Sequence, residues 1–232
     1  MVRLHIVENT QLRKPYVTAF VTMSVDGKIA SRSGDSRLSC PFDKKKLHEL
    51  RATSDGVMVG ANTVRIDDPL LTPRLVQVEK PPARIVVDGK LTLTPTYRVF
   101  KVKDAPTYLI TSSKTPESKL RKFEDIGVNV IKAPEKDDEV NLNYALSELY
   151  GKGVKHILVE GGGNLIWSLL KQNLIDELRV TISPFIIGGK AAITPVEGEG
   201  FTNLGSWVRL ELLNYFLCEC GQEIHLVYRV KH

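Results

Sequence analysis

Three glycines follow a carboxylate at the end of an apolar run, in the stretch Ile157-Leu158-Val159-Glu160-Gly161-Gly162-Gly163-Asn164. The run has the composition of a buried strand, and the residues from 165 to 171 are predicted to form a helix. Glycines let a backbone turn sharply and approach a ligand, and the N–H groups that open a helix attract a pyrophosphate. The spacing is not G-x-G-x-x-G, and no P-loop lysine follows. The stretch therefore predicts either a phosphate-binding turn or a tight structural turn.

Glu160 ends the predicted strand at the position where open α/β sheets bind ligands. A carboxylate there can bind a polar heterocycle or transfer a proton, and the alternative is a capping or surface carboxylate. Asp26-Gly27 follows another predicted strand and is typical of a hairpin turn.

Polar residues also follow the short apolar run from 56 to 60, in the stretch Gly60-Ala61-Asn62-Thr63-Val64-Arg65-Ile66-Asp67-Asp68-Pro69. Gly60 permits a turn, and asparagine and threonine cap what comes after a turn. Arg74, a little further on, is suited to pair with a phosphate. Ser36 lies in a polar loop, and Arg51 lies near the end of a predicted helix, where a cation is also favoured for structural reasons. Each of these features is, by itself, also consistent with plain turn or capping chemistry.

Composition narrows the class of protein. The 232 residues are 42% hydrophobic and 25% charged, with a net charge of +5, which is typical of a globular α/β protein. Cations are scattered without interleaved aromatics, so nucleic-acid binding is not favoured. No apolar stretch approaches 18 residues, and the N-terminus has no h-region, so we expect no membrane span and a cytoplasmic protein.

The three cysteines, Cys40, Cys218 and Cys220, do not have the spacing of a disulfide framework. Cys218 and Cys220 are two apart in a run predicted as a strand, which places them on one face. No second Cys/His pair completes a zinc ligand set, so we predict packing residues and no metal.

Strands and helices are predicted to alternate as far as about residue 171, and strands alone follow. The predicted strands are 16–23, 56–60, 84–88, 107–111, 128–131, 156–160, 177–182, 208–218 and 223–230, and the predicted helices are 41–53, 116–126, 142–150 and 165–171. Residues 28–30 are expected to resume extended structure, and residues 61–74 to be irregular. This order predicts an α/β fold with a mostly parallel central sheet, flanking helices and an antiparallel C-terminal edge. No linker divides the chain, so we expect one domain over residues 1–232.

Taken together and in this order, the segments resemble the riboflavin-biosynthesis reductase family. The resemblance rests on Met23-Ser24-Val25-Asp26-Gly27-Lys28, Val59 to Val64 with Asp67-Asp68-Pro69 and Leu71-Thr72, Ile85 to Asp88, and Glu160 to Gly163. It implies a dihydrofolate-reductase-like fold, NADPH as cofactor and a homodimer. The chain lacks the H-x-E and P-C-x-x-C signature of a zinc deaminase domain, so it resembles the stand-alone archaeal or fungal type, and its short strand–turn details favour the archaeal one.

The resemblance also implies site residues. Those expected beside the cofactor are Met23, Thr63, Asp67, Asp88, Gly89, Lys90, Leu91, Val130, Gly161, Gly162, Gly163 and Asn164. Those expected beside the substrate are Ser36, Arg51, Leu71, Arg74 and Glu160. Gly89 stands where relatives often carry serine, which removes any side-chain contact there.

The reaction that the resemblance implies is reduction of the ribosyl group of 2,5-diamino-6-(ribosylamino)pyrimidin-4-one 5′-phosphate to ribityl. Arg51 or Arg74 is expected to hold the 5′-phosphate, Glu160 to bind the pyrimidine or assist a proton transfer, and Asp26 to be a second proton-transfer candidate. The stretch from Thr111 to Lys114 is a candidate for the 2′-phosphate of NADPH. The alternatives are a reductase of the deaminated pyrimidine, a reductase of a folate or pterin, and a non-catalytic binding protein.

Overall fold

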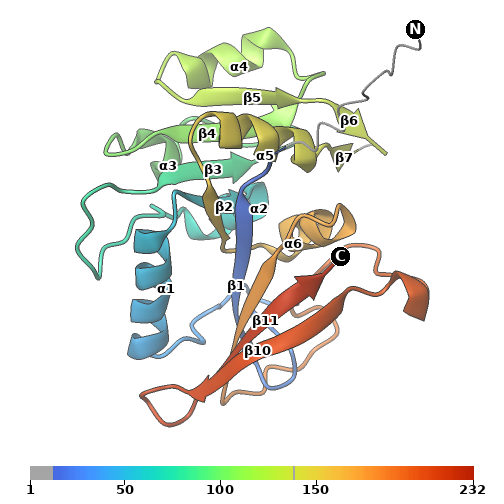
Figure 1. Ribbon diagram of the computed structural model, residues 1–232. Coiled ribbons are helices and arrows are strands. Elements are labelled where there is room, and N and C mark those ends of the chain that lie inside the picture. The colour runs from blue at the N-terminus through green and yellow to red at the C-terminus, as the bar shows by residue number, and fades with distance from the viewer. Residues whose placement is uncertain (1–12, 138) are drawn as a thin grey trace, which may run out of the picture.

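One twisted sheet of nine strands runs through the molecule (Figure 1). The computed structural model describes residues 13–137 and 139–232. The sheet has the order β10-β11-β9-β1-β8-β2-β3-β4-β5, and a separate hairpin consists of β6 and β7. The strands are β1 Tyr16–Ser24, β2 Gly56–Gly60, β3 Ala83–Val87, β4 Thr107–Ser112, β5 Asn129–Ala133, β6 Glu135–Lys136, β7 Glu139–Val140, β8 His156–Val159, β9 Glu177–Ser183, β10 Arg209–Leu217 and β11 Ile224–Lys231. The helices are α1 Pro41–Thr53, α2 Ala61–Asp67, α3 Arg98–Lys101, α4 Glu117–Glu124, α5 Leu142–Gly151, α6 Gly163–Lys171 and the short 3-10 turn Leu204–Ser206.

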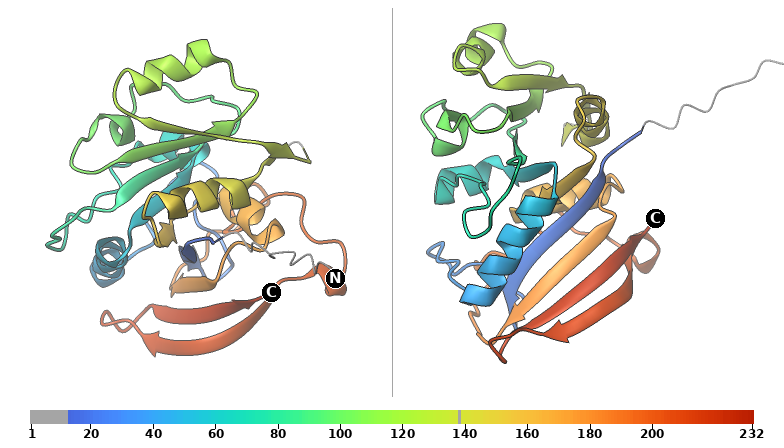
Figure 2. Two further views of the ribbon diagram at one scale, coloured as in Figure 1. Left: turned by 45° about the horizontal axis from the view of Figure 1, so that its top comes forward. Right: turned by 60° about the vertical axis from the view of Figure 1, so that its left-hand side comes forward.

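The strands from β9 to β5 in this order are parallel, whereas β11 pairs antiparallel with both β9 and β10. Figure 2 shows the β10–β11 pair at one end of the sheet and α4 with β5 at the other. This arrangement confirms the predicted α/β class, the mostly parallel sheet and the antiparallel C-terminal edge.

Helices cover both faces of the sheet, which is why its central strands are apolar along their length. Successive side chains on a strand point to opposite faces, so Ile85 of β3 packs toward α5 and α6 while Val86 packs toward α2, α3 and α4. Leu50 of α1 packs on Phe20 and Leu158 of the face that carries Val86. Among the described residues, no helix is long and apolar enough to cross a membrane.

Three local predictions are wrong. Ala61–Asp67 forms helix α2, although only Val64 of this helix is buried and so no apolar period announces it. Residues 28–30 form no strand and contribute a single bridge, between Ala30 and Ile193. β10 ends at Leu217, so Cys218 and Cys220 lie in the turn between β10 and β11 and not on one face of a strand.

Candidate functional site

A cavity of about 760 Å³ lies where β8, β2 and β3 end. These strands are neighbours and parallel, so their carboxyl ends meet at one edge of the sheet, where α/β proteins bind ligands. The predicted cofactor residues that line the cavity are Thr63, Asp67, Asp88, Gly89, Lys90, Gly162, Gly163 and Asn164, and Ser36 is the predicted substrate residue that lines it.

Two helices begin at the cavity wall. α2 follows Gly60 and α6 follows Gly162, and neither helix has a side-chain cap at its first turn. Gly60 donates its N–H to the carbonyl of Gly161 over 3.1 Å, which ties the two helix starts together. Uncapped N–H groups and the partial positive charge of a helix start suit an anionic group such as a pyrophosphate.

Close packing requires glycine at position 163 of the Gly161–Gly163 turn and leaves little room for a side chain at position 162. A Cβ atom on Gly163 would lie 2.5 Å from Cγ of Glu197 and 2.8 Å from the carbonyl oxygen of Thr194. A Cβ atom on Gly162 would lie 3.2 Å from Oγ1 of Thr63. The turn therefore packs α6, α2 and the loop after β9 closely around one cavity, and Gly162 and Gly163 line its wall.

The charges on the cavity wall are mostly paired. Of the described residues that line the cavity, the cations are Arg65 and Lys90. Arg65 donates to Oδ1 of Asn62 over 2.5 Å and to Oγ1 of Thr92 over 2.7 Å. The sequence prediction had not selected Arg65, because an arginine in a segment expected to be irregular has no distinguishing local signal.

Two acidic residues on the same wall, Asp88 and Glu135, have close partners that offset their negative charge. Asp88 is buried and accepts from the N–H groups of Thr92 and Leu93 over 2.7 and 2.8 Å. Glu135 pairs with Lys114, and the lysine and the nearby Ser112 hydroxyl lower the pKa of Glu135. The side chain of Asp67 remains accessible from the cavity, yet the surrounding groups exclude enough water to raise its pKa.

Arg51 and Glu160, which the sequence predicted to face the substrate, form a buried ion pair, and neither residue lines the cavity. Nε and Nη2 of Arg51 each donate over 2.6 Å to one carboxylate oxygen of Glu160, and both side chains are about one-tenth exposed. Nη1 of Arg51 donates to the carbonyl of Thr72 over 3.0 Å. The pair joins α1 to the end of β8 and to the loop that carries Leu71 and Arg74. This forked geometry fixes the plane of the Glu160 carboxylate.

His48 lies beside these groups on α1. Its Nδ1 atom accepts the N–H of Leu75 over 3.4 Å. Burial, followed by the positive charges of Arg51 and Arg74, lowers the pKa of His48 to about 4. The imidazole is therefore neutral at physiological pH. Arg74 itself is exposed.

Asp26 connects two loops that border the cavity. Its carboxylate accepts from the hydroxyl of Ser24 over 2.6 Å and from the N–H groups of Ile187 and Gly188 over 3.0 and 2.6 Å. These hydrogen bonds, that from Ser24 first, lower the pKa of Asp26 to about 2. The same two loops meet again where Ile29 donates its N–H to the carbonyl of Ile193 over 2.9 Å, and both residues line the cavity.

Other predicted residues do not reach the cavity wall with their side chains. Leu71 and Leu91 are 2% and 7% exposed and pack in the core under α2, α3 and α4, so any ligand contact there comes from backbone atoms. Val130 lies on the edge strand β5 and packs against the same core. Met23 and Gly161 adjoin the site on β1 and in the glycine turn but do not line the cavity.

A second hollow of about 930 Å³ lies between the residues that precede β1 and the ends of α5 and α6. It is lined by polar side chains such as Lys14, Asn141 and Lys171, and it contains none of the predicted site residues. The carboxyl edge of the sheet is therefore the better candidate for a functional site.

Comparison with known proteins identifies the family of the chain. Residues 15–226 match the family model described as RibD C-terminal domain. The chain is 36% identical over 220 residues to a 2,5-diamino-6-ribosylamino-4(3H)-pyrimidinone 5′-phosphate reductase of Methanothermobacter thermautotrophicus, covering 94% of this chain and 99% of the relative. It is 32% identical over 213 residues to the riboflavin biosynthesis protein RibD of Bacillus amyloliquefaciens, covering 91% of this chain and 56% of the longer relative.

Solved structures agree on the fold. A RibD of Acinetobacter baumannii superposes with a TM-score of 0.77 at 22% identity, covering 94% of this chain and 58% of that one. A pyrimidine reductase-like protein of Corynebacterium diphtheriae superposes with a TM-score of 0.76 at 24% identity, covering 95% and 93%. The cavity, the glycine turn and the fold thus occur in a chain whose sequence matches one family model over nearly its whole length, and the chain belongs to the RibD C-terminal domain family.

Proposed function

We propose that this protein reduces the ribosyl group of 2,5-diamino-6-(ribosylamino)pyrimidin-4-one 5′-phosphate to a ribityl group, with NADPH, in riboflavin biosynthesis. The observation that carries the proposal is the cavity at the ends of β8, β2 and β3, lined by eight of the residues predicted to bind the cofactor. Stand-alone relatives with this activity in their names are 36% identical over nearly their full length.

The residues of the cavity fit a dinucleotide phosphate. Gly162 and Gly163 line the cavity, and the starts of α2 and α6 offer N–H groups to a pyrophosphate. Arg65 and Lys90 are the cations on the wall that can pair with a 2′-phosphate, and they replace Lys114 as the preferred candidates because Lys114 pairs with Glu135. NADPH supplies a hydride to the substrate when it is bound.

On the substrate side, Glu160 keeps a lone pair on each carboxylate oxygen after pairing with Arg51, and these accept hydrogen bonds from the amino groups of the pyrimidine. Arg51 is committed to Glu160 and Thr72, so it orients the carboxylate. Arg74 is exposed and is the better candidate for the 5′-phosphate.

The chemistry requires the ribosylamine ring to open to an imine at C1′, which then accepts the hydride, while a proton goes to the nitrogen. Asp26 holds two loops together through three hydrogen bonds and has a pKa of about 2, so it positions the loops in this mechanism and water delivers the proton.

The test is NADPH oxidation followed by absorbance, with the diamino and the deaminated ribosylamino-pyrimidine phosphates supplied in parallel. We expect turnover of the diamino compound. Turnover of the deaminated compound alone would assign the chain to the order of steps in which deamination comes first. Silence with both, under conditions where a homologous reductase is active, would refute the proposal.

We further propose a homodimer that uses the β10 edge. Apolar side chains are exposed on both faces of this edge strand, among them Leu212 at 49%, Tyr215 at 69% and Leu217 at 62%. An exposed apolar edge strand is a pairing surface. Tyr215→Asp is expected to shift the mass measured by light scattering from dimer to monomer, and Tyr144→Asp, at an exposed tyrosine on α5, is the control that should stay dimeric.

A further inference from the structure

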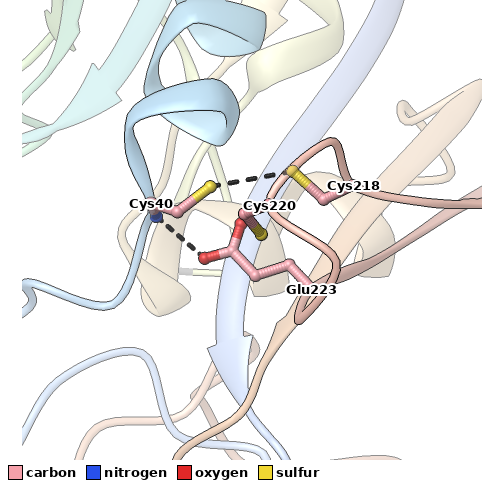
Figure 3. A group of neighbouring side chains, drawn as sticks. All are labelled: Cys40, Cys218, Cys220 and Glu223. Carbon is pink, nitrogen blue, oxygen red and sulfur yellow. Dashed lines mark hydrogen bonds between the residues drawn. The ribbon is translucent and has the colours of Figure 1, made fainter.

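All three cysteines of the chain converge with one carboxylate at the base of α1 (Figure 3). Cys40 immediately precedes α1, Cys218 and Cys220 lie in the turn between β10 and β11, and Glu223 immediately precedes β11. Their sulfur and carboxylate oxygen atoms all lie within 4.8 Å of one another. Segments 178 residues apart in the chain therefore supply four potential metal ligands to one place.

Glu223 has one carboxylate oxygen that lacks a protein partner. Oε1 accepts from the N–H of Cys40 over 2.8 Å and from the hydroxyl of Ser183 over 3.2 Å. Oε2 is buried, and among the described residues it has no hydrogen-bond partner, although the side chain is only 2% exposed. A buried carboxylate is normally paired, hydrogen-bonded or bound to a cation, so this oxygen indicates that the cluster is incomplete as a purely protein structure.

The sulfur geometry matches a metal and not a disulfide. The Sγ atoms of Cys40 and Cys218 are 3.7 Å apart. Two sulfurs bound to one tetrahedral zinc ion at about 2.3 Å lie about 3.8 Å apart, whereas a disulfide has a length of about 2.05 Å. Three sulfur ligands favour zinc over magnesium or calcium, which prefer oxygen.

We propose that Cys40, Cys218, Cys220 and Glu223 bind one Zn²⁺ ion in a structural site. Four protein ligands fill a tetrahedral shell and leave no position for a substrate, which is typical of structural zinc. On binding, each protonated thiol releases its proton to water and donates the resulting thiolate to the ion, without any change of oxidation state.

The site would tie the start of α1 to the β10–β11 turn. α1 carries Arg51, the partner of Glu160, and β10 is the exposed edge of the sheet. The start of α1 has a second attachment, since buried Asp43 accepts from the hydroxyls of Thr22 and Thr181 over 2.8 Å each. Variants at the cysteines are therefore expected to fold, which makes the site testable by substitution.

The experiment uses the full chain without a metal-binding tag, purified with its thiols reduced and dialysed against a weak chelator. We expect about one zinc ion per chain by elemental mass spectrometry. Replacement by Co²⁺ should give the intense thiolate-to-cobalt absorption of a tetrahedral site. Cys220→Ser and Glu223→Gln should each lower the affinity for Zn²⁺ by more than about 100-fold, since even indirect ligand partners contribute 10- to 100-fold.

Glu219→Gln is the matched control, because it removes the same charge from an exposed residue of the same turn and should keep the full zinc content. The proposal would be overturned if the parent protein, reduced and loaded with zinc, retained no more zinc than the triple variant Cys40→Ser/Cys218→Ser/Cys220→Ser. A mass lower by two hydrogens after exposure to air, in a protein that binds no zinc when reduced, would also overturn it and identify a redox-active pair among these three cysteines.

Discussion

Breaking the Arg51–Glu160 pair tests whether the proposed substrate side of the site is built around a buried charge. Both side chains are about one-tenth exposed and share two hydrogen bonds of 2.6 Å. Removing one partner from a buried pair leaves an uncompensated charge and costs about 3–5 kcal/mol. For a chain of this size, 1 kcal/mol lowers Tm by roughly 2–4 °C, so Arg51→Met should lower Tm by roughly 6–20 °C.

The double variant Arg51→Met/Glu160→Leu separates stability from function. Replacing both charges by apolar groups removes the uncompensated charge, so we expect most of the lost free energy of unfolding to return. Activity should stay low, because the carboxylate that accepts the pyrimidine amino groups is absent. Glu160→Gln alone should lower kcat/KM by about 10- to 100-fold, the equivalent of a charge-assisted hydrogen bond.

The assays are thermal and urea unfolding followed by circular dichroism, and NADPH oxidation with the diamino substrate. Lys132→Met is the control, because it breaks the Lys132–Glu117 pair, whose side chains are 39% and 62% exposed, and it should cost less than about 1 kcal/mol. The reasoning fails if Arg51→Met unfolds within about 0.5 kcal/mol of the parent, or if the double variant turns over substrate at the parent rate.

Three further predictions concern pH, cofactor preference and packing. His48 has a pKa of about 4 in the folded protein and of 6.5 when unfolded, so the unfolded state binds more protons between these pH values and stability falls as pH drops through this window. Urea unfolding at pH 7 and at pH 5 should show that the His48→Gln variant loses less stability than the parent. Equal losses would contradict this prediction. Arg65→Gln should raise KM for NADPH by about 10- to 100-fold with little change in KM for NADH, whereas Lys114→Gln should leave the preference for NADPH over NADH unchanged. Steady-state kinetics with both cofactors test this. If Lys114 binds the 2′-phosphate, the effects of the two variants will be reversed. Gly163→Ala should lower the free energy of unfolding by about 1–3 kcal/mol and weaken NADPH binding measured by fluorescence, because its Cβ would lie 2.8 Å from a backbone oxygen. A Cβ on Gly151 would meet no atom within 4 Å, so Gly151→Ala should change neither stability nor NADPH binding.

The sequence was sufficient for the class of the sheet and for several residues that line the cavity. Apolar runs of four to six residues that end in Gly60, Asp88 or Glu160 indicate buried parallel strands, and the carboxyl ends of such strands must meet at one edge. Local chemistry thus placed Thr63, Asp88 and the glycine turn correctly at the cavity, because each lies directly after its strand. Helix α2 escaped prediction because a seven-residue helix with one buried side chain has no measurable apolar period.

Only the tertiary structure decided how the distant charges and thiols are paired. Arg51 and Glu160 were both predicted to face the substrate, yet their pairing depends on α1 lying across the end of β8, 109 residues further along the chain. Cys40 meets Cys218 for the same kind of reason, since the antiparallel edge folds back toward the start of α1. Periodicity and turn chemistry report interactions within a few residues, whereas these contacts depend on how complete elements pack, which is a property of the whole core.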